Sequence, residues 1–167
     1  GALRFTEKAE NDFVTELDPK SEKMIREILL SEFPEDAFYG EEGGGAEHAH
    51  GRWIVDPIDG TQSFLRGQHG WCISIAYEYE GELVVGCVYA PDVDELFLAV
   101  RGKGALLNGK PIHVSPVSDP RKGILHFGYG HRVPESFKRF IALVPDLFAK
   151  ISDVRRYGTA AYGLCTV

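Results

Sequence analysis

Residues 71–114 carry the pattern that most restricts how this chain can fold. Apolar side chains alternate with other residues over 71–79, and nearly continuous apolar runs follow at 83–89 and 96–100. Short runs of this kind, separated by turn residues, are typical of β-strands. The dipeptide Asn108-Gly109 lies between two further short segments, and it favours the two-residue turn of a β-hairpin. The block therefore predicts an antiparallel sheet in which successive strands are neighbours.

Helical patterns flank this sheet on both sides. Asp18 is a favoured helix cap, Pro19 a favoured first helical residue, and Pro34 ends the first pattern. Pro145 interrupts or kinks a later helix, and Thr159 is expected to cap the last one. Apolar spacing places the three helices at residues 18–33, 134–151 and 160–167. Helices around an antiparallel sheet indicate an α+β or layered αβ architecture.

Composition limits the classes of partner. The chain has 18 Lys and Arg against 25 Asp and Glu, a formal charge of −7, and no basic run longer than two residues. We therefore expect no nucleic-acid partner, because phosphate-backbone binding needs clustered basic side chains. No apolar run has the length of a membrane span, so we expect no membrane association. Three widely spaced cysteines without a CxxC pair indicate reduced thiols and a cytoplasmic protein.

The segment 53–61, Trp-Ile-Val-Asp-Pro-Ile-Asp-Gly-Thr, carries the chemistry. A short strand is expected to end at Asp56, and a proline turn separates this carboxylate from Asp59. The turn can aim both carboxylates and the Ile58 carbonyl into one pocket. Such hard oxygen ligands select Mg²⁺ or Mn²⁺ over zinc, and a cation allows both carboxylates to stay ionised. The spacing excludes an Asp-x-Asp phosphatase nucleophile and an EF-hand, and leaves a simple β-turn as the structural alternative.

Two further acidic positions complete a known pattern. Taken alone, Glu41 would belong to a solvated turn after a strand at 37–39, and Asp18 would be only a helix cap. Together with segment 53–61, they make the chain resemble the inositol monophosphatase family of magnesium-dependent, lithium-sensitive phosphatases. The matching segments occur in family order at 12–18, 40–42, 53–64, 86–91, 102–105, 107–112 and 158–161.

The resemblance implies a layered αβαβα fold with a largely antiparallel sheet, in a single domain over residues 1–167. It also implies hydrolysis of a small phosphomonoester by a metal-activated water, with Mg²⁺ as cofactor, Mn²⁺ as a substitute, and Li⁺ and Ca²⁺ as inhibitors. The implied metal ligands are Glu41, Asp56, Asp59 and the Ile58 carbonyl. The implied catalytic pair is Asp18 and Thr61. The resemblance also implies that the phosphate group binds at Gly60 and Thr61, and that the alcohol part of the substrate binds at Gly158, Thr159 and Ala160.

Segments 86–91 and 102–112 are most similar to the branch that acts on inositol 1-phosphate, so that compound or a similar polyol phosphate is the expected substrate. Histidinol phosphate, fructose 1,6-bisphosphate and 3′-phosphoadenosine 5′-phosphate are the alternatives. A non-catalytic binding protein on the same fold is the alternative of another class. The resemblance also implies a homodimer. The first helix of the family and the segment that supplies a further metal-binding Asp have no counterpart in residues 1–167, so we expect a longer protein.

Overall fold

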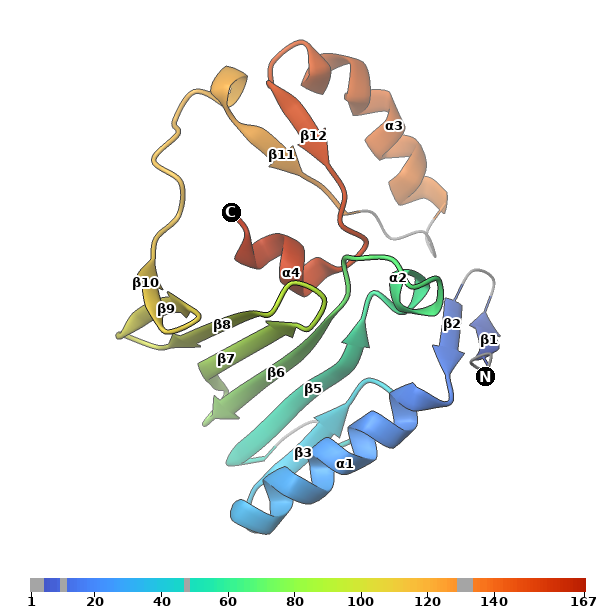
Figure 1. The fold of residues 1–167 in the computed structure, drawn as a ribbon, viewed down its shortest axis with the longest axis vertical. Coiled ribbons are helices and arrows are strands. Elements are labelled where there is room, and N and C mark those ends of the chain that lie inside the picture. Colours follow the sequence, from blue (N-terminus) through green and yellow to red (C-terminus); the bar gives the residue numbers. More distant parts are fainter. Residues whose placement is uncertain (1–4, 10–11, 47–48, 129–133) are drawn as a thin grey trace.

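The computed structural model describes residues 5–9, 12–46, 49–128 and 134–167 of the chain. An eight-stranded sheet with the order β10-β9-β8-β7-β6-β5-β3-β4 forms its centre (Figure 1). Every pairing in this sheet is antiparallel except that of β3 with β5. Its strands are β3 (Ala37–Gly40), β4 (Gly44–Gly45), β5 (Gly51–Asp59), β6 (Cys72–Tyr79), β7 (Glu82–Ala90), β8 (Glu95–Val100), β9 (Gly104–Leu107) and β10 (Lys110–Ile112). The predicted α+β fold with a largely antiparallel sheet is confirmed.

The predicted run of neighbouring strands is also confirmed, from β6 to β10. Asn108 and Gly109 join β9 to β10, and both residues have positive φ angles, 48° and 76°. Two central residues with positive φ define the hairpin turn that matches the twist of antiparallel strands. Leu107 accordingly pairs with Lys110 across the turn.

Helices cover both faces of the sheet. The chain leaves α1 (Leu17–Glu32) at Phe33, whose ring packs 5.3 Å from that of Trp53 in β5. In α4 (Ala160–Cys165), the ring of Tyr162 lies 6.1 Å from that of Phe97 in β8. The strand register places Trp53 and Phe97 on opposite faces, so α1 and α4 lie on opposite sides of the sheet.

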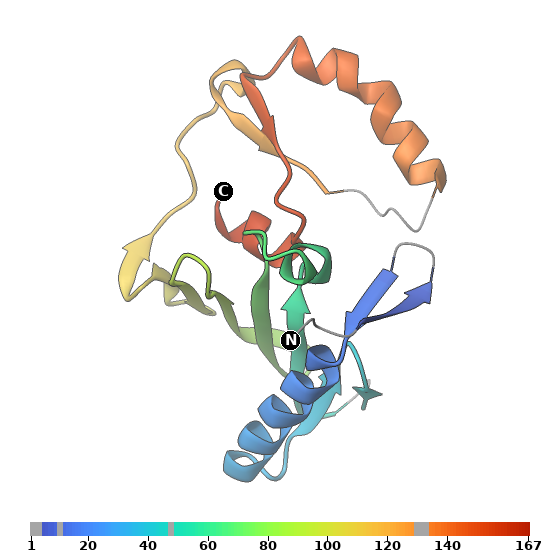
Figure 2. The ribbon, with the colours of Figure 1, turned by 45° about the vertical axis from the view of Figure 1, so that its right-hand side comes forward.

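The remaining elements lie around the sheet. A hairpin of β1 (Phe5–Ala9) and β2 (Asp12–Thr15) precedes α1. The long helix α3 (Pro134–Phe148) lies beside β11 (Ile124–His126) and β12 (Asp153–Arg155), at the end of the molecule away from α1 (Figure 2). The short helix α2 (Thr61–Leu65) follows β5, and a 3₁₀ turn covers Pro120–Lys122. No helix in the described part of the chain is long and apolar enough to cross a membrane.

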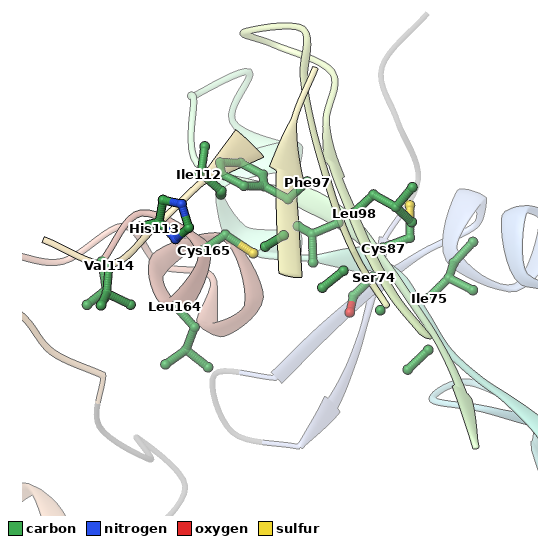
Figure 3. Close-up of a pocket in the computed structure, with 16 residues that line it drawn as sticks. Ser74, Ile75, Cys87, Phe97, Leu98, Ile112, His113, Val114, Leu164 and Cys165 are labelled. Atoms are coloured by element: carbon green, nitrogen blue, oxygen red, sulfur yellow. The ribbon is translucent and has the colours of Figure 1, made fainter. Parts of the chain in front are cut away.

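An apolar pocket of about 550 Å³ lies where α4 faces the sheet (Figure 3). Phe97 and Leu98 of β8 and Leu164 and Cys165 of α4 contribute to its walls. Cys165 and Cys87, which also lines the pocket, are free and partly exposed. Cys72 is free and completely buried, so the described cysteines are unpaired as predicted.

Two predicted boundaries at the candidate site were wrong. Asp18 is not the cap of α1, because the helix begins at Leu17 and Glu16 occupies the cap position. Asp18 lies in the first turn of the helix, where its carboxylate faces Thr61. The strand predicted to end at Asp56 continues to Asp59. The register of β5 shifts between these two residues, and such a bulge accommodates Pro57, which cannot donate to a regular strand ladder.

Two predicted helix ends also differ. α3 continues through Pro145, whose carbonyl still accepts from the Ala149 N–H at 3.3 Å, and it ends at Phe148 rather than at residue 151. The last helix ends at Cys165, although Thr159 caps it as predicted, since its hydroxyl accepts from the Tyr162 N–H at 3.4 Å.

Candidate metal centre

Glu41 and Asp56 meet because β3 and β5 are parallel. Gly40, the last residue of β3, pairs with Val55 within β5, so Glu41 and Asp56, the next residues of the two segments, lie side by side. The Glu41 N–H donates to the Val55 carbonyl at 3.0 Å, which continues the ladder by one residue. The side chains of Glu41 and Asp56 then share a hydrogen bond.

The charges at this edge are crowded. Burial, the negative charge and hydrogen bond of Glu41, and the negative charge of Asp59 together raise the pKa of the Asp56 carboxyl from 3.8 to about 8. The Ile58 N–H, which donates to Asp56 Oδ1 at 3.0 Å, acts in the opposite direction but does not compensate. A divalent cation would relieve this repulsion and let the carboxyl groups ionise. A set of carboxylate and carbonyl oxygens suits Mg²⁺ or Mn²⁺, so the residues present fit such an ion.

The turn after β5 brings the two predicted catalytic side chains together. Gly60 has a φ angle of 98°, and a Cβ there would lie 2.8 Å from the Gly70 carbonyl oxygen, so only glycine fits without distortion. The turn starts α2 at Thr61, whose hydroxyl lies 3.4 Å from Asp18 Oδ1 and 3.1 Å from the Ile58 carbonyl oxygen. Asp18 is only 2% exposed, so its carboxylate depends on such contacts.

Asp59 lies on the other side of the turn and contacts the start of α4. Its Oδ2 accepts from the Thr159 hydroxyl and from the Ala161 N–H, the latter at 2.7 Å. The Cys72 thiol is 3.8 Å from the same oxygen. A pocket of about 430 Å³ opens beside this contact, and Asp59, Gly158, Thr159 and Ala160 all line it.

The structure thus brings some predicted ligands together and not others. Glu41 and Asp56 are in contact, whereas the Asp59 carboxylate is turned toward α4. Within the described ranges, no three Asp, Glu, His or Cys side chains converge closely enough to enclose an ion. The roles of these residues as ligands remain predictions from the resemblance and from the charge arrangement.

Two residues at the site were not predicted. Glu22 is 5% exposed, and its carboxylate accepts from the backbone of the loop that carries Glu41. A helical spacing of four residues from Asp18 was a usable signal, since it places both side chains on one face of α1. Cys72 is fully buried behind Asp59, and burial raises the pKa of its thiol to about 12. The sequence carries no comparable signal for Cys72, because its pairing with Asp59 depends on the β5–β6 register.

Comparison with known proteins decides the family. The model of the inositol monophosphatase family matches residues 3–167 of the chain. The chain belongs to the inositol monophosphatase family. Among its relatives, Nus factor SuhB of Vibrio cholerae is 37% identical over 165 residues, which are 98% of this chain and 62% of the relative. Inositol-1-monophosphatase of Rhizobium meliloti is 36% identical over 168 residues, 99% of this chain and 63% of that protein.

Solved structures of family members share the fold. The extragenic suppressor protein suhB of Bartonella henselae aligns with a TM-score of 0.92 and 36% identity, over 99% of this chain and 64% of the other. An IMPase/NADP phosphatase complexed with Mg²⁺ and phosphate aligns with a TM-score of 0.85 and 28% identity, over 99% of this chain and 62% of the other. The chain therefore spans somewhat less than two thirds of the length of these relatives.

Proposed function

We propose that the protein hydrolyses a small phosphomonoester in a reaction that depends on Mg²⁺. The observation that carries this proposal is the crowded carboxyl pair of Glu41 and Asp56 beside the Thr61–Asp18 contact. The family supports it, as does a related structure described as complexed with Mg²⁺ and phosphate. When bound, the cation would supply charge neutralisation at the phosphoryl group and acidify a water molecule.

The chain's own residues would hold and orient the reactants. Glu41, Asp56, Asp59 and the Ile58 carbonyl would hold the cation. The Thr61 hydroxyl can donate to Asp18, 3.4 Å away, which leaves its oxygen lone pairs to accept a hydrogen bond from the attacking water. This arrangement would align the water and give its proton a path toward Asp18.

The start of α4 is the proposed wall for the alcohol part of the substrate. Gly158, Thr159 and Ala160 line the 430 Å³ pocket that also contains Asp59. Asp59 would therefore connect the cation to the substrate pocket, since its carboxylate holds Thr159 and the Ala161 N–H. Inositol 1-phosphate or a similar polyol phosphate is the proposed substrate, in keeping with the name of the Rhizobium meliloti relative. Histidinol phosphate and fructose 1,6-bisphosphate are the competing substrates.

A second candidate is a non-catalytic binding role. It is favoured by the Vibrio cholerae relative, which is named as a Nus factor rather than as a phosphatase. The two candidates differ in what the site must do, because binding another protein requires neither a cation at Asp56 nor an aligned water at Thr61.

Phosphate release separates the two roles. The purified full-length protein is incubated with each of the three phosphomonoesters, with Mg²⁺ or with EDTA, and inorganic phosphate is measured. We expect release that requires Mg²⁺, is fastest with inositol 1-phosphate, and is lost in Asp56→Ala. The matched control is Asp94→Ala, which removes a carboxylate that accepts from Tyr89 at 3.0 Å, outside the candidate metal centre. Absence of release from all three substrates would reject hydrolysis and favour the binding role.

A further inference from the structure

Glu22 is a buried carboxylate that the proposed chemistry does not use. It lies on α1, one helical turn after Asp18, and only 5% of its surface is exposed. A charged or polar side chain at such a position is costly unless its oxygens are fully hydrogen bonded. Its partners therefore show what holds it there.

Both Glu22 oxygens accept from the loop that follows β3. The Glu42 N–H donates to Oε2 at 2.8 Å, and the Gly43 N–H donates to Oε1 at 2.9 Å. These are the two residues immediately after Glu41. On its other side, Glu41 donates its own N–H to the Val55 carbonyl at 3.0 Å. The backbone around Glu41 is thus held from α1 and from β5 at once.

The last residue of β3 and the loop after it approach the Glu22 carboxylate too closely for a side chain at either position. A Cβ at Gly40 would lie 2.2 Å from the carboxyl carbon of Glu22, and one at Gly43 would lie 2.7 Å from Oε1. Glycine at both positions therefore permits the contact. The close approach and the two hydrogen bonds together show that Glu22 of α1 packs tightly against the loop.

We propose that Glu22 is the positioning residue for Glu41 and sets the place of that side chain beside Asp56. In this arrangement α1 serves both halves of the site, because Asp18 contacts Thr61 while Glu22 holds the Glu41 loop. The inference rests on the proposed function only in taking Glu41 as a metal ligand. Residues that orient a ligand in this way affect metal affinity by about 10- to 100-fold.

The decisive variant is Glu22→Gln, which keeps the volume but replaces one acceptor oxygen by an NH₂ group that faces a backbone N–H. Mn²⁺ binding to the full-length protein is measured by isothermal titration calorimetry without substrate. We expect the dissociation constant to rise by roughly 10- to 100-fold. The matched control is Glu27→Gln on the same helix, whose carboxylate is exposed and lies 3.8 Å from Lys23 Nζ. It should change Mn²⁺ affinity by less than about twofold, as expected for an exposed ion pair.

A second variant keeps the test valid if Glu22→Gln does not fold. Gly43→Ala keeps the Glu22 carboxylate in the sequence but forces it and the loop apart, so Mn²⁺ affinity should fall there as well. Its control is Gly86→Ala, where a Cβ would meet nothing within 4 Å. A folded Glu22→Gln or Gly43→Ala protein with a lower melting temperature but unchanged Mn²⁺ affinity would overturn the inference, because Glu22 would then be only structural.

The outcomes for the two proposals are distinguishable. Mn²⁺ binding that weakens in Glu22→Gln, in a protein that releases no phosphate, would reject hydrolysis and support the role of Glu22. If the unmodified protein releases phosphate, and the unmodified protein and Glu22→Gln bind Mn²⁺ with equal affinity, hydrolysis is supported and the role of Glu22 is rejected. Absence of Mn²⁺ binding by the unmodified protein would reject both.

Discussion

Replacement of Asp56 by Asn should stabilise the metal-free protein while removing its metal site. In the fold, burial and the neighbouring Glu41 and Asp59 hold the pKa of Asp56 at about 8 instead of 3.8. The folded state therefore binds this proton more tightly than the unfolded chain does. The corresponding contribution to stability is complete below pH 3.8 and is lost progressively as the pH rises through about 8. Asn is neutral at every pH, so the variant avoids the loss.

The magnitude follows from the shift in pKa. Each unit corresponds to about 1.4 kcal/mol, so a rise from 3.8 to about 8 sets an upper bound near 6 kcal/mol. Asp56 keeps some contact with solvent, which screens the neighbouring charges and reduces this figure. We expect Asp56→Asn to raise the free energy of unfolding by about 2–4 kcal/mol at pH 8 in EDTA. At pH 4 the two proteins should differ little.

Urea denaturation at pH 4 and pH 8, with EDTA and with Mg²⁺, measures both the stability of the metal-free protein and its stabilisation by the ion. Mg²⁺ should stabilise the unmodified protein at pH 8 and leave Asp56→Asn unchanged, because only the former binds the ion. Glu27→Gln, which removes an exposed carboxylate, is the control and should follow the unmodified protein. Equal stability of Asp56→Asn and the unmodified protein at pH 8 in EDTA would refute the reasoning.

Three further variants test the roles of Asp59 and Thr61, which lie on either side of Gly60. Asp59→Asn should lower kcat by about a hundredfold or more, because the amide keeps the shape but removes the charge of a proposed metal ligand, and the circular dichroism spectrum should stay unchanged. Unchanged turnover would make Asp59 a turn residue. Thr61→Ala should lower kcat by about 10²–10⁴ with nearly constant Mn²⁺ affinity and KM, whereas Thr61→Ser should keep much of the activity. Weakened Mn²⁺ binding with constant kcat would make Thr61 a structural cap.

The parts of the fold that sequence predicted well are those determined locally. Asn108-Gly109 forms its hairpin because positive φ angles at two adjacent residues suffice to make the turn. The pair β11–β12 was missed for the opposite reason. Each strand has only three residues, too few for a periodic pattern, and α3 separates the two parallel strands along the chain.

At the candidate site, too, local features were easier to predict than contacts between residues far apart in the sequence. The carboxylates of segment 53–61 were selected from their spacing and from the resemblance, although Asp56 and Asp59 lie in a bulged part of β5 rather than in the predicted turn. Local cap preference placed Asp18 wrongly as a helix cap, whereas its tertiary contact with Thr61 was expected only from the resemblance. The orientation of Asp59 toward α4 was not predicted, because its partner Ala161 lies 102 residues further along the chain.

Crystals of the full-length protein soaked with Mn²⁺ provide the most direct test of the metal centre. Anomalous diffraction should show an ion within about 2.0–2.6 Å of a carboxylate oxygen of Glu41, a carboxylate oxygen of Asp56 and the Ile58 carbonyl oxygen. The direct hydrogen bond between Glu41 and Asp56 should then be replaced by shared coordination. Absence of an anomalous peak at saturating Mn²⁺, with Glu41 and Asp56 still hydrogen bonded to each other, would contradict the proposed metal-dependent chemistry.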